Sequence, residues 1–359
     1  MNEHLLHRLY DGKYVKSNEP TFIYRPVKQI TVDVDKIEGM LLGAAIGDAL
    51  GGTSEWLSSS DRFDRFGFID KYVTDTGIPG VGVPTDDTQL TFDTVDVILD
   101  KRYLDGQALV KRFVSHDIYG IGSTVSQFVR NYTELVYPWY ASGVIGGAGN
   151  GALMRISPAL IPSLKSKSEN PIVDTVIDTM VTHNSPMTIG TTVAFTMLLR
   201  SLMNDKTPFN GEMTECFADI TSKFTGNDIY TTKSTGLAGF RGSVPDFLRK
   251  SVQTGLSSNM SVTEFGERFG PGYDGLDTTA MVLFILEKYL DTPEDALLEA
   301  VNHTLDNDTI GAIVGSAVGA RYGKRAFRKE WVTDLSGRTR LDDDGAVFTK
   351  IAAVKAFLK

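Results

Sequence analysis

Apolar and polar positions follow a helical period over most of the chain after Ile37. Apolar residues spaced three or four apart, or small apolar residues throughout, are typical of packed helices. These patterns cover the ranges 38–50, 88–104, 106–117, 172–183, 188–203, 276–290, 294–304, 308–321 and 344–358. No Val/Ile-rich strands alternate with them, which argues against a doubly wound sheet. The pattern predicts a single all-α domain with glycine- and proline-rich loops at 76–84, 142–151 and 225–243.

The first 36 residues lack this pattern. Residues 21–27, TFIYRPV, are typical of extended chain, because Pro26 disfavours both a helix and a central strand. We therefore expect an N-terminal arm over 1–36, followed by a compact domain over 37–359. Two interpretations of the arm stay open, namely a tail packed on the body and an arm that binds a partner.

Composition narrows the classes of protein. The formal charge of −9 argues against an electrostatic nucleic-acid binder, and the single cysteine excludes a disulfide framework. No apolar run reaches the ~20 residues of a membrane span, and the N-terminus lacks the apolar stretch of a signal peptide. We expect a cytoplasmic protein that binds neither nucleic acid nor membrane.

Glycine is in excess, with 35 in 359 residues, or about 10% against a usual share of roughly 7%. Eight of them are spaced by four in two segments: Gly39, Gly43, Gly47 and Gly51, then Gly311, Gly315, Gly319 and Gly323. Residues four apart share one helix face, so each segment presents a smooth strip. Because glycine costs a helix about 1 kcal/mol relative to alanine, we expect close backbone packing as compensation.

Two acidic clusters stand where helical patterns are expected to begin. They are Thr85-Asp86-Asp87-Thr88 and Asp306-Asn307-Asp308-Thr309. Carboxylates and hydroxyls form an oxygen ligand set that suits Mg²⁺, Ca²⁺ or Mn²⁺, and two such clusters are enough for a pair of cations. The alternative is ordinary helix capping by residues that the helix dipole favours.

Other candidates adjoin flexible turns. Glu55 follows the first glycine strip, where a carboxylate can act as a general base, although surface solvation is the simpler interpretation. Asp48, inside that helix, is expected to make buried hydrogen bonds. The loop Gly146–Gly151 can turn its N–H groups toward an anion, or simply be a tight turn. His183 at a helix end and Tyr273 in a glycine-rich loop are possible ligand contacts, with capping and core packing as the alternatives.

Taken in order, these segments resemble the ADP-ribosylglycohydrolase family. The resemblance rests on the following segments: GMLLGAAIGDALGGTSEW at 39–56, PTDDTQL at 84–90, GAGNGALMRISPAL at 147–160, THNSP at 182–186 and LDNDTIGAIVGSAVGARYG at 305–323. They span about residues 37–325, roughly four-fifths of the chain. Five modest motifs in the family's order are together specific.

The resemblance implies a compact all-α fold with two Mg²⁺ or Mn²⁺ ions at the bottom of a cleft. It implies metal ligands at Thr85, Asp86, Asp87, Asp306, Asp308 and Thr309. It also implies a catalytic Glu55 and substrate contacts from Gly147, Gly149, Asn150, Gly151, His183 and Tyr273. The implied reaction releases ADP-ribose from a modified protein, with arginine as the expected acceptor.

Two departures from the family pattern matter. Thr304 and Leu305 precede the second acidic cluster where the family often has two glycines, so the loop near the ribose is expected to differ. The first 36 residues lie outside the family core. Some members that resemble this chain are immunity proteins against ADP-ribosylating toxins, which implies an arm that blocks such a toxin. The rival interpretation is a catalytically silent binding protein on the same fold.

Overall fold

The computed structural model describes residues 2–25, 27–31, 33–74, 80–166, 169–204, 212–231, 240–272 and 274–359. Helices dominate this part of the chain, and their apolar side chains form one connected core, so the prediction of an all-α, single-domain fold is confirmed. The α-helices are α1 (Asn2–Asp11), α2 (Val34–Gly51), α3 (Ser59–Phe66), α4 (Asp86–Lys101), α5 (Gly106–Phe113), α6 (Ser123–Thr133), α7 (Ile161–Lys165), α8 (Pro171–Met180), α9 (Pro186–Leu202), α10 (Met213–Thr225), α11 (Val244–Ser257), α12 (Val262–Phe269), α13 (Gly275–Tyr289), α14 (Pro293–His303), α15 (Asn307–Tyr322), α16 (Lys329–Thr333) and α17 (Ala346–Leu358).

Short strands and 3-10 turns join these helices. The strands are β1 (Val144–Ile145), β2 (His183–Asn184), β3 (Tyr230–Thr231) and β4 (Arg241–Gly242). The 3-10 turns are η1 (Thr21–Tyr24), η2 (Gly52–Ser54), η3 (Trp139–Ala141), η4 (Ser157–Leu160) and η6 (Gly323–Ala326). β1 and β2 pair in parallel, with Val144 opposite His183, and β3 and β4 pair antiparallel. The parallel pair ties the glycine-rich loop after β1 to the segment before α9.

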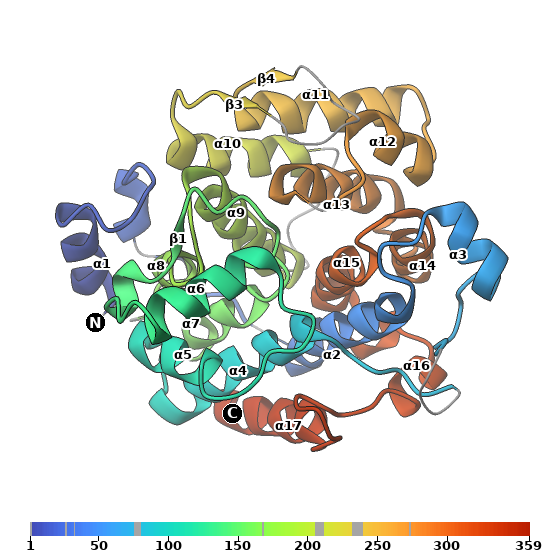
Figure 1. The fold of residues 1–359 in the computed structure, drawn as a ribbon, viewed down its shortest axis with the longest axis horizontal. Coiled ribbons are helices and arrows are strands. Elements are labelled where there is room, and N and C mark those ends of the chain that lie inside the picture. Colours follow the sequence, from blue (N-terminus) through green and yellow to red (C-terminus); the bar gives the residue numbers. More distant parts are fainter. Residues whose placement is uncertain are drawn as a thin grey trace.

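The two glycine-strip helices, α2 and α15, pack against each other at the centre of the molecule (Figure 1). A Cβ atom built on Gly43 would lie 2.0 Å from the carbonyl oxygen of Gly315, and one on Gly47 would lie 2.0 Å from that of Gly311. Such distances leave no room for a side chain on either strip. The expectation of close backbone packing between the strips is therefore confirmed.

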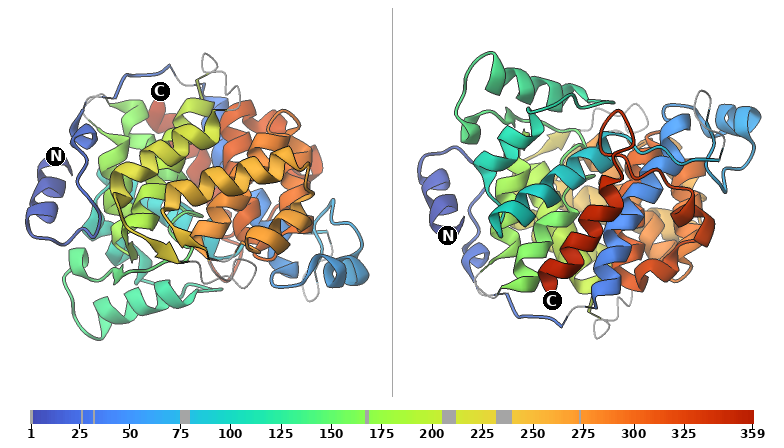
Figure 2. Two further views of the ribbon diagram at one scale, coloured as in Figure 1. Left: turned by 90° about the horizontal axis from the view of Figure 1, so that it is seen from above. Right: turned by 90° about the horizontal axis from the view of Figure 1, so that it is seen from below.

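Other helices surround this central pair on all sides. α4, α9, α13, α14 and α17 contact α2 or α15, and Figure 2 shows α17 running beside α2. Nearly every residue of α2 and α15 is buried, including polar ones, as expected for helices that are apolar or small all round. None of the helices in the described part of the chain combines the length and hydropathy needed to span a bilayer.

The N-terminal residues pack on the body. Helix α1 contacts α8, Leu6 and Ile23 are fully buried, and the Asn2 side chain donates to Asp174 Oδ1 at 2.7 Å. The expectation of extended chain over 21–27 is wrong for η1, where Thr21–Tyr24 form a 3-10 turn that buries Ile23; Pro26 lies outside the described residues. Burial of Ile23 outweighs the local preference of these β-branched and aromatic residues for extended backbone.

Candidate functional site

Three helix ends meet at the site. Gly51, the last residue of α2, lies so close to the start of α15 that a Cβ there would be 2.4 Å from Asp308 N. One turn earlier, Asp48 accepts hydrogen bonds from the backbone N–H groups of Thr85 and Thr88, at 2.9 and 3.0 Å. Asp48 thus satisfies the N–H groups at the start of α4 from a different helix, since the Thr85 side chain makes no capping bond. The buried hydrogen bonds expected of Asp48 are confirmed.

This convergence gathers two groups of carboxylates. Asp48, Asp87 and Asp308 form one group, and Glu55, Asp306 and Asp308 form the other. Within each group, one oxygen from every residue lies within 4.8 Å of the others. Asp308 belongs to both groups, so the two positions are adjacent and share a carboxylate. Carboxylate oxygens in this arrangement are suited to hard divalent cations.

Burial and mutual repulsion make it costly to ionise these carboxyl groups without a counter-ion. Burial, followed by the nearby Asp48, raises the pKa of Asp87 well above its usual range, and burial followed by Asp87 does the same for Asp308. The Oδ1 atom of Asp87 is buried without a hydrogen-bond partner. A buried, unpaired carboxylate oxygen costs free energy that a bound cation would offset. The residues present therefore fit a divalent metal.

The remaining predicted ligands surround the same two positions. The hydroxyls of Thr85 and Thr309 each lie 3.5 Å from Asp87 Oδ2. Asp86 lines the cavity, and burial raises its pKa well above the usual range, with Asp48 adding to the effect. The structure thus brings all six predicted ligands together at the starts of α4 and α15.

Glu55 stands at the edge of the cluster, just after the 3-10 turn that ends α2. Burial and the charges of Asp306 and Asp48 raise its pKa to about 7. A carboxyl that titrates near neutrality can exchange a proton at working pH, which is the property that a general acid or base needs. The next residue, Trp56, has a left-handed backbone with φ of 64° and also lines the cavity.

The glycine-rich loop forms the opposite wall. Its carbonyl at Gly147 accepts from the hydroxyls of Ser185 and Thr188, both at 2.9 Å, which fixes the loop on the start of α9. Asn150 crosses to the acidic cluster, where its amide donates to Asp306 Oδ2 at 2.7 Å and to Thr278 Oγ1 at 3.1 Å. Three of the predicted substrate contacts, Gly149, Asn150 and Gly151, therefore line the same cavity as predicted metal ligands, whereas Gly147 does not line it and anchors the loop on α9.

His183 supports this loop from behind. It lines the cavity but is almost fully buried, and a Cβ on Gly151 would lie 3.2 Å from its ring. Burial and then the charge of Arg155 lower its pKa to about 3, so the ring is neutral near pH 7. His183 therefore cannot exchange a proton near pH 7. Tyr273, the other expected contact, lies outside the described residues.

The cavity between these walls has a volume of about 300 Å³. It is lined by Glu55, Trp56, Asp86, Asp87, Gly120, Gly122, Ser123, Thr124, Val125, Gly149, Asn150, Gly151, Met154, His183, Asp306, Asp308 and Thr309. Sequence reasoning missed Trp56, the start of α6 at Ser123 and Thr124, and the place of Asp48 in a carboxylate group. For Asp48 a signal existed, because a charged residue inside an otherwise apolar helix is costly unless it serves a partner.

Comparison with known proteins identifies the family and several relatives. The model of the family described as ADP-ribosylglycohydrolase matches residues 29–356. The ADP-ribosyl-[dinitrogen reductase] glycohydrolase of Rhodospirillum rubrum is 23% identical over 312 residues, covering 84% of this chain and 90% of that protein. The ADP-ribosylarginine hydrolase Tri1 of Serratia proteamaculans is 23% identical, covering 86% and 78%. ADP-ribosylhydrolase ARH3 of Danio rerio is 23% identical, covering 86% and 89%.

A solved structure has the same fold. A chain of an "ADP-ribosylglycohydrolase-related protein complex" superimposes with a TM-score of 0.65 at 24% identity, covering 90% of this chain and 97% of that one. The family match begins at residue 29, so the first 28 residues precede it.

Proposed function

The chain belongs to the ADP-ribosylglycohydrolase family, and on that premise we propose that it is a metal-dependent hydrolase that removes ADP-ribose from a modified protein side chain. One observation carries the proposal. Two carboxylate groups share Asp308 at one end of a cavity whose opposite wall is a glycine-rich loop. Catalytic water activation and anion binding need these two components next to each other.

Two Mg²⁺ or Mn²⁺ ions would be held by Asp86, Asp87, Asp306 and Asp308 with the hydroxyls of Thr85 and Thr309. When bound, such ions supply charge that orients ribose hydroxyls and lowers the pKa of a bound water. Two observations support this assignment, namely the unpartnered Oδ1 of Asp87 and the raised pKa of Asp308. A bound cation would give the oxygen a partner and would stabilise the ionised form of Asp308.

The loop residues and Glu55 would complete the site. Gly147, Gly149 and Gly151 would place backbone against the diphosphate, and Asn150 would link that loop to Asp306 through its 2.7 Å hydrogen bond. Glu55 would take a proton from the attacking water, or give one to the departing side chain. Its pKa of about 7 supports either direction of transfer.

We propose arginine as the acceptor residue. Two relatives named ADP-ribosylarginine hydrolase, from Serratia proteamaculans and Pseudomonas putida, support this choice at 23% and 24% identity. The acidic cavity supports it as well, because a guanidinium leaving group is a cation until it departs. We also propose a cytoplasmic location, in which ADP-ribosylated proteins would be accessible.

The test is release of free ADP-ribose from proteins modified on arginine, on serine and on a nucleotide end, each with Mg²⁺ and after chelation. We expect release from the arginine-linked substrate only, and none after chelation. The rival function is a silent binding protein, which would bind the modified protein without releasing ADP-ribose under either condition. Release that persists after chelation would contradict the assignment of the metal.

A toxin-blocking role for residues 1–36 stays a prediction. Its support is the position of the first 28 residues ahead of the family match and the exposed side chains of α1 at His4, His7 and Arg8. A toxin would have to contact this exposed face, since Leu6 and Ile23 are buried against the body. Charge reversal at Arg8, with hydrolysis as the control, would abolish binding of an ADP-ribosyltransferase if the role exists.

A further inference from the structure

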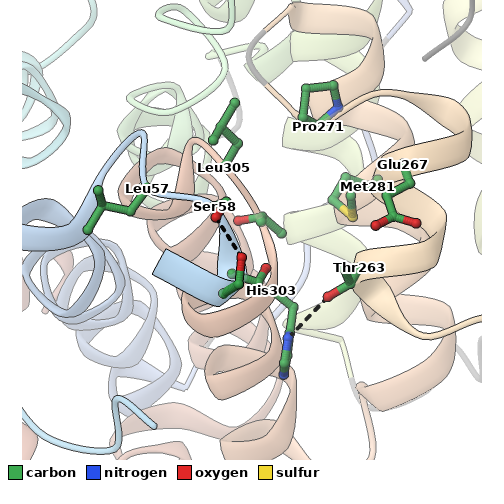
Figure 3. A pocket seen from close by; sticks show the side chains of 12 residues that line it. Leu57, Ser58, Thr263, Glu267, Pro271, Met281, His303 and Leu305 are labelled. Atoms are coloured by element: carbon green, nitrogen blue, oxygen red, sulfur yellow. Dashed lines mark hydrogen bonds between the residues drawn. The ribbon is translucent and has the colours of Figure 1, made fainter. Parts of the chain in front are cut away.

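A second pocket lies beside the proposed active site, between α3 and α12 (Figure 3). Its volume is about 460 Å³, within the range of ligand pockets of roughly 300–1,000 Å³. Leu57, Pro271, Met281 and Leu305 supply apolar surface. The polar groups are Ser58, Ser59, Ser60, Thr263, Glu267, His303 and Thr304. None of the roles assigned above uses this pocket.

The pocket and the active-site cavity share two loops. Trp56 lines the cavity and Leu57 lines the pocket, while Asp306 lines the cavity and Leu305 lines the pocket. In each loop consecutive residues line the two hollows, and consecutive Cα atoms are only about 3.8 Å apart. The loops are joined by a hydrogen bond from Trp56 N to Leu305 O at 3.1 Å.

Trp56 occupies the boundary in a strained conformation. A non-glycine residue at φ of 64° costs free energy and persists where surrounding contacts hold it, as the hydrogen bond to Leu305 does here. The indole is nevertheless 56% exposed, so burial does not explain the conformation. An exposed aromatic ring that is held between two hollows is typical of a contact surface.

The side chains that line the pocket indicate which class of ligand it can bind. Among the described residues that line it there is no lysine or arginine, and His303 donates to or accepts from Thr263 at 3.3 Å. A phosphate or a second nucleotide would therefore find no lysine or arginine to pair with among these residues. Apolar surface with a rim of hydroxyls suits an apolar side chain whose backbone lies on the rim.

We propose that this pocket and Trp56 form the docking surface for the acceptor protein, with the pocket holding an apolar side chain next to the modified residue. The proposal rests on the proposed function, because a protein attached to ADP-ribose in the cavity must leave it across an adjoining surface. α3 and α6 project on the same side of the molecule in both views of Figure 2. The active-site cavity is lined by the start of α6 and by Glu55 and Trp56, which precede α3. Trp56 lines that cavity, and the next residue, Leu57, lines the pocket, so the two hollows adjoin along this loop.

Two substitutions fill the pocket from opposite walls, Thr263→Trp on α12 and Ser59→Trp on α3. Gln253→Trp, on the exposed face of α11 and in none of the described hollows, is the matched control. Each variant is assayed on an ADP-ribosylated protein and on the free ADP-ribosylated amino acid, which lacks flanking residues. We expect KM for the protein to rise about tenfold in both pocket variants, the factor expected for one lost apolar side chain, with the small substrate unaffected.

Binding measurements keep the two proposals separable. Wild type and both pocket variants are titrated with the ADP-ribosylated protein and with free ADP-ribose. If wild type hydrolyses neither substrate, the proposed function fails, yet weaker binding of the protein alone to the variants still supports docking. Three outcomes would overturn the docking proposal. The pocket variants could lose equal affinity for the protein and for free ADP-ribose, they could bind both as wild type does, or the substitutions could change the oligomeric state.

Discussion

Gly43 and Gly315 leave no space for a side chain on either helix. A Cβ on Gly43 would lie 2.0 Å from the carbonyl oxygen of Gly315, and a Cβ on Gly315 would lie 2.1 Å from that of Gly43. The contact repeats along α2 and α15, and it ends where Gly51 meets Asp308. This pair of glycines therefore fixes the distance between the helices that carry the acidic residues.

Gly43→Ala is expected to destabilise the protein by about 2 kcal/mol or more, because the two nearest atoms belong to the backbone of Gly315 and cannot rotate away. Gly266→Ala is the matched control, since that helical glycine faces the flexible end of Met281 at 3.2 Å. There alanine should be neutral, or stabilising by up to about 1 kcal/mol. Urea unfolding of both variants checks this, and equal effects would contradict it.

The centre of the fold could be predicted from the sequence because the residues that determine how α2 and α15 pack lie within short segments of the chain. Glycines spaced by four imply a smooth face, and two such strips imply close packing. Acidic residues at the helix starts could be predicted for the same reason, since each cluster stands where a helical pattern begins. Each of these signals lies within one short segment of chain, such as 39–51 or 306–309.

The rest of the site depends on tertiary contacts that leave no local pattern. Ser123 and Thr124 reach the cavity only because α6 folds back over it, and Asp48 joins Asp87 only because α4 docks on α2. The same reason explains the wrong expectation for Thr21–Tyr24. Their sequence favours extended chain, whereas burial of Ile23 on the body favours a tight turn.

Asp308→Asn is expected to remove the response to metal, because Asp308 belongs to both carboxylate groups. Mg²⁺ should raise the Tm of wild type. At a hundred times Kd the bound ion adds about 2.7 kcal/mol to the free energy of unfolding, and the Tm of the variant should stay unchanged. After chelation the variant should be at least as stable as wild type, since one buried charge is gone and the amide oxygen can still accept from Thr309 N. Asp295→Asn, exposed on α14, is the control and should keep the response.

The chelated protein is expected to lose stability as pH rises from about 4.5 to about 7. Folding raises the pKa of Glu55 from 4.5 to about 7. Between these two values Glu55 is ionised in the unfolded chain but stays protonated in the folded protein. The stability that Glu55 contributes is fully present below its pKa in the unfolded chain. It is lost once the pH reaches its pKa in the folded protein. Chelated Glu55→Gln should therefore match wild type near pH 4.5 and exceed it near pH 7. Thermal melts across the window check this, and a constant difference would contradict it.

Glu55→Gln is also expected to lower kcat by about 10²–10⁴, the usual contribution of a general acid or base, while binding of free ADP-ribose is retained. The amide keeps the size of the carboxyl but cannot exchange the proton. Because bound cations favour the carboxylate, the pH limb of kcat in the metal-loaded wild type should lie below 7, and it should be absent from the variant. Asp61→Asn, exposed on α3, is the control and should leave kcat unchanged. Turnover of Glu55→Gln within threefold of wild type would assign proton transfer to another group.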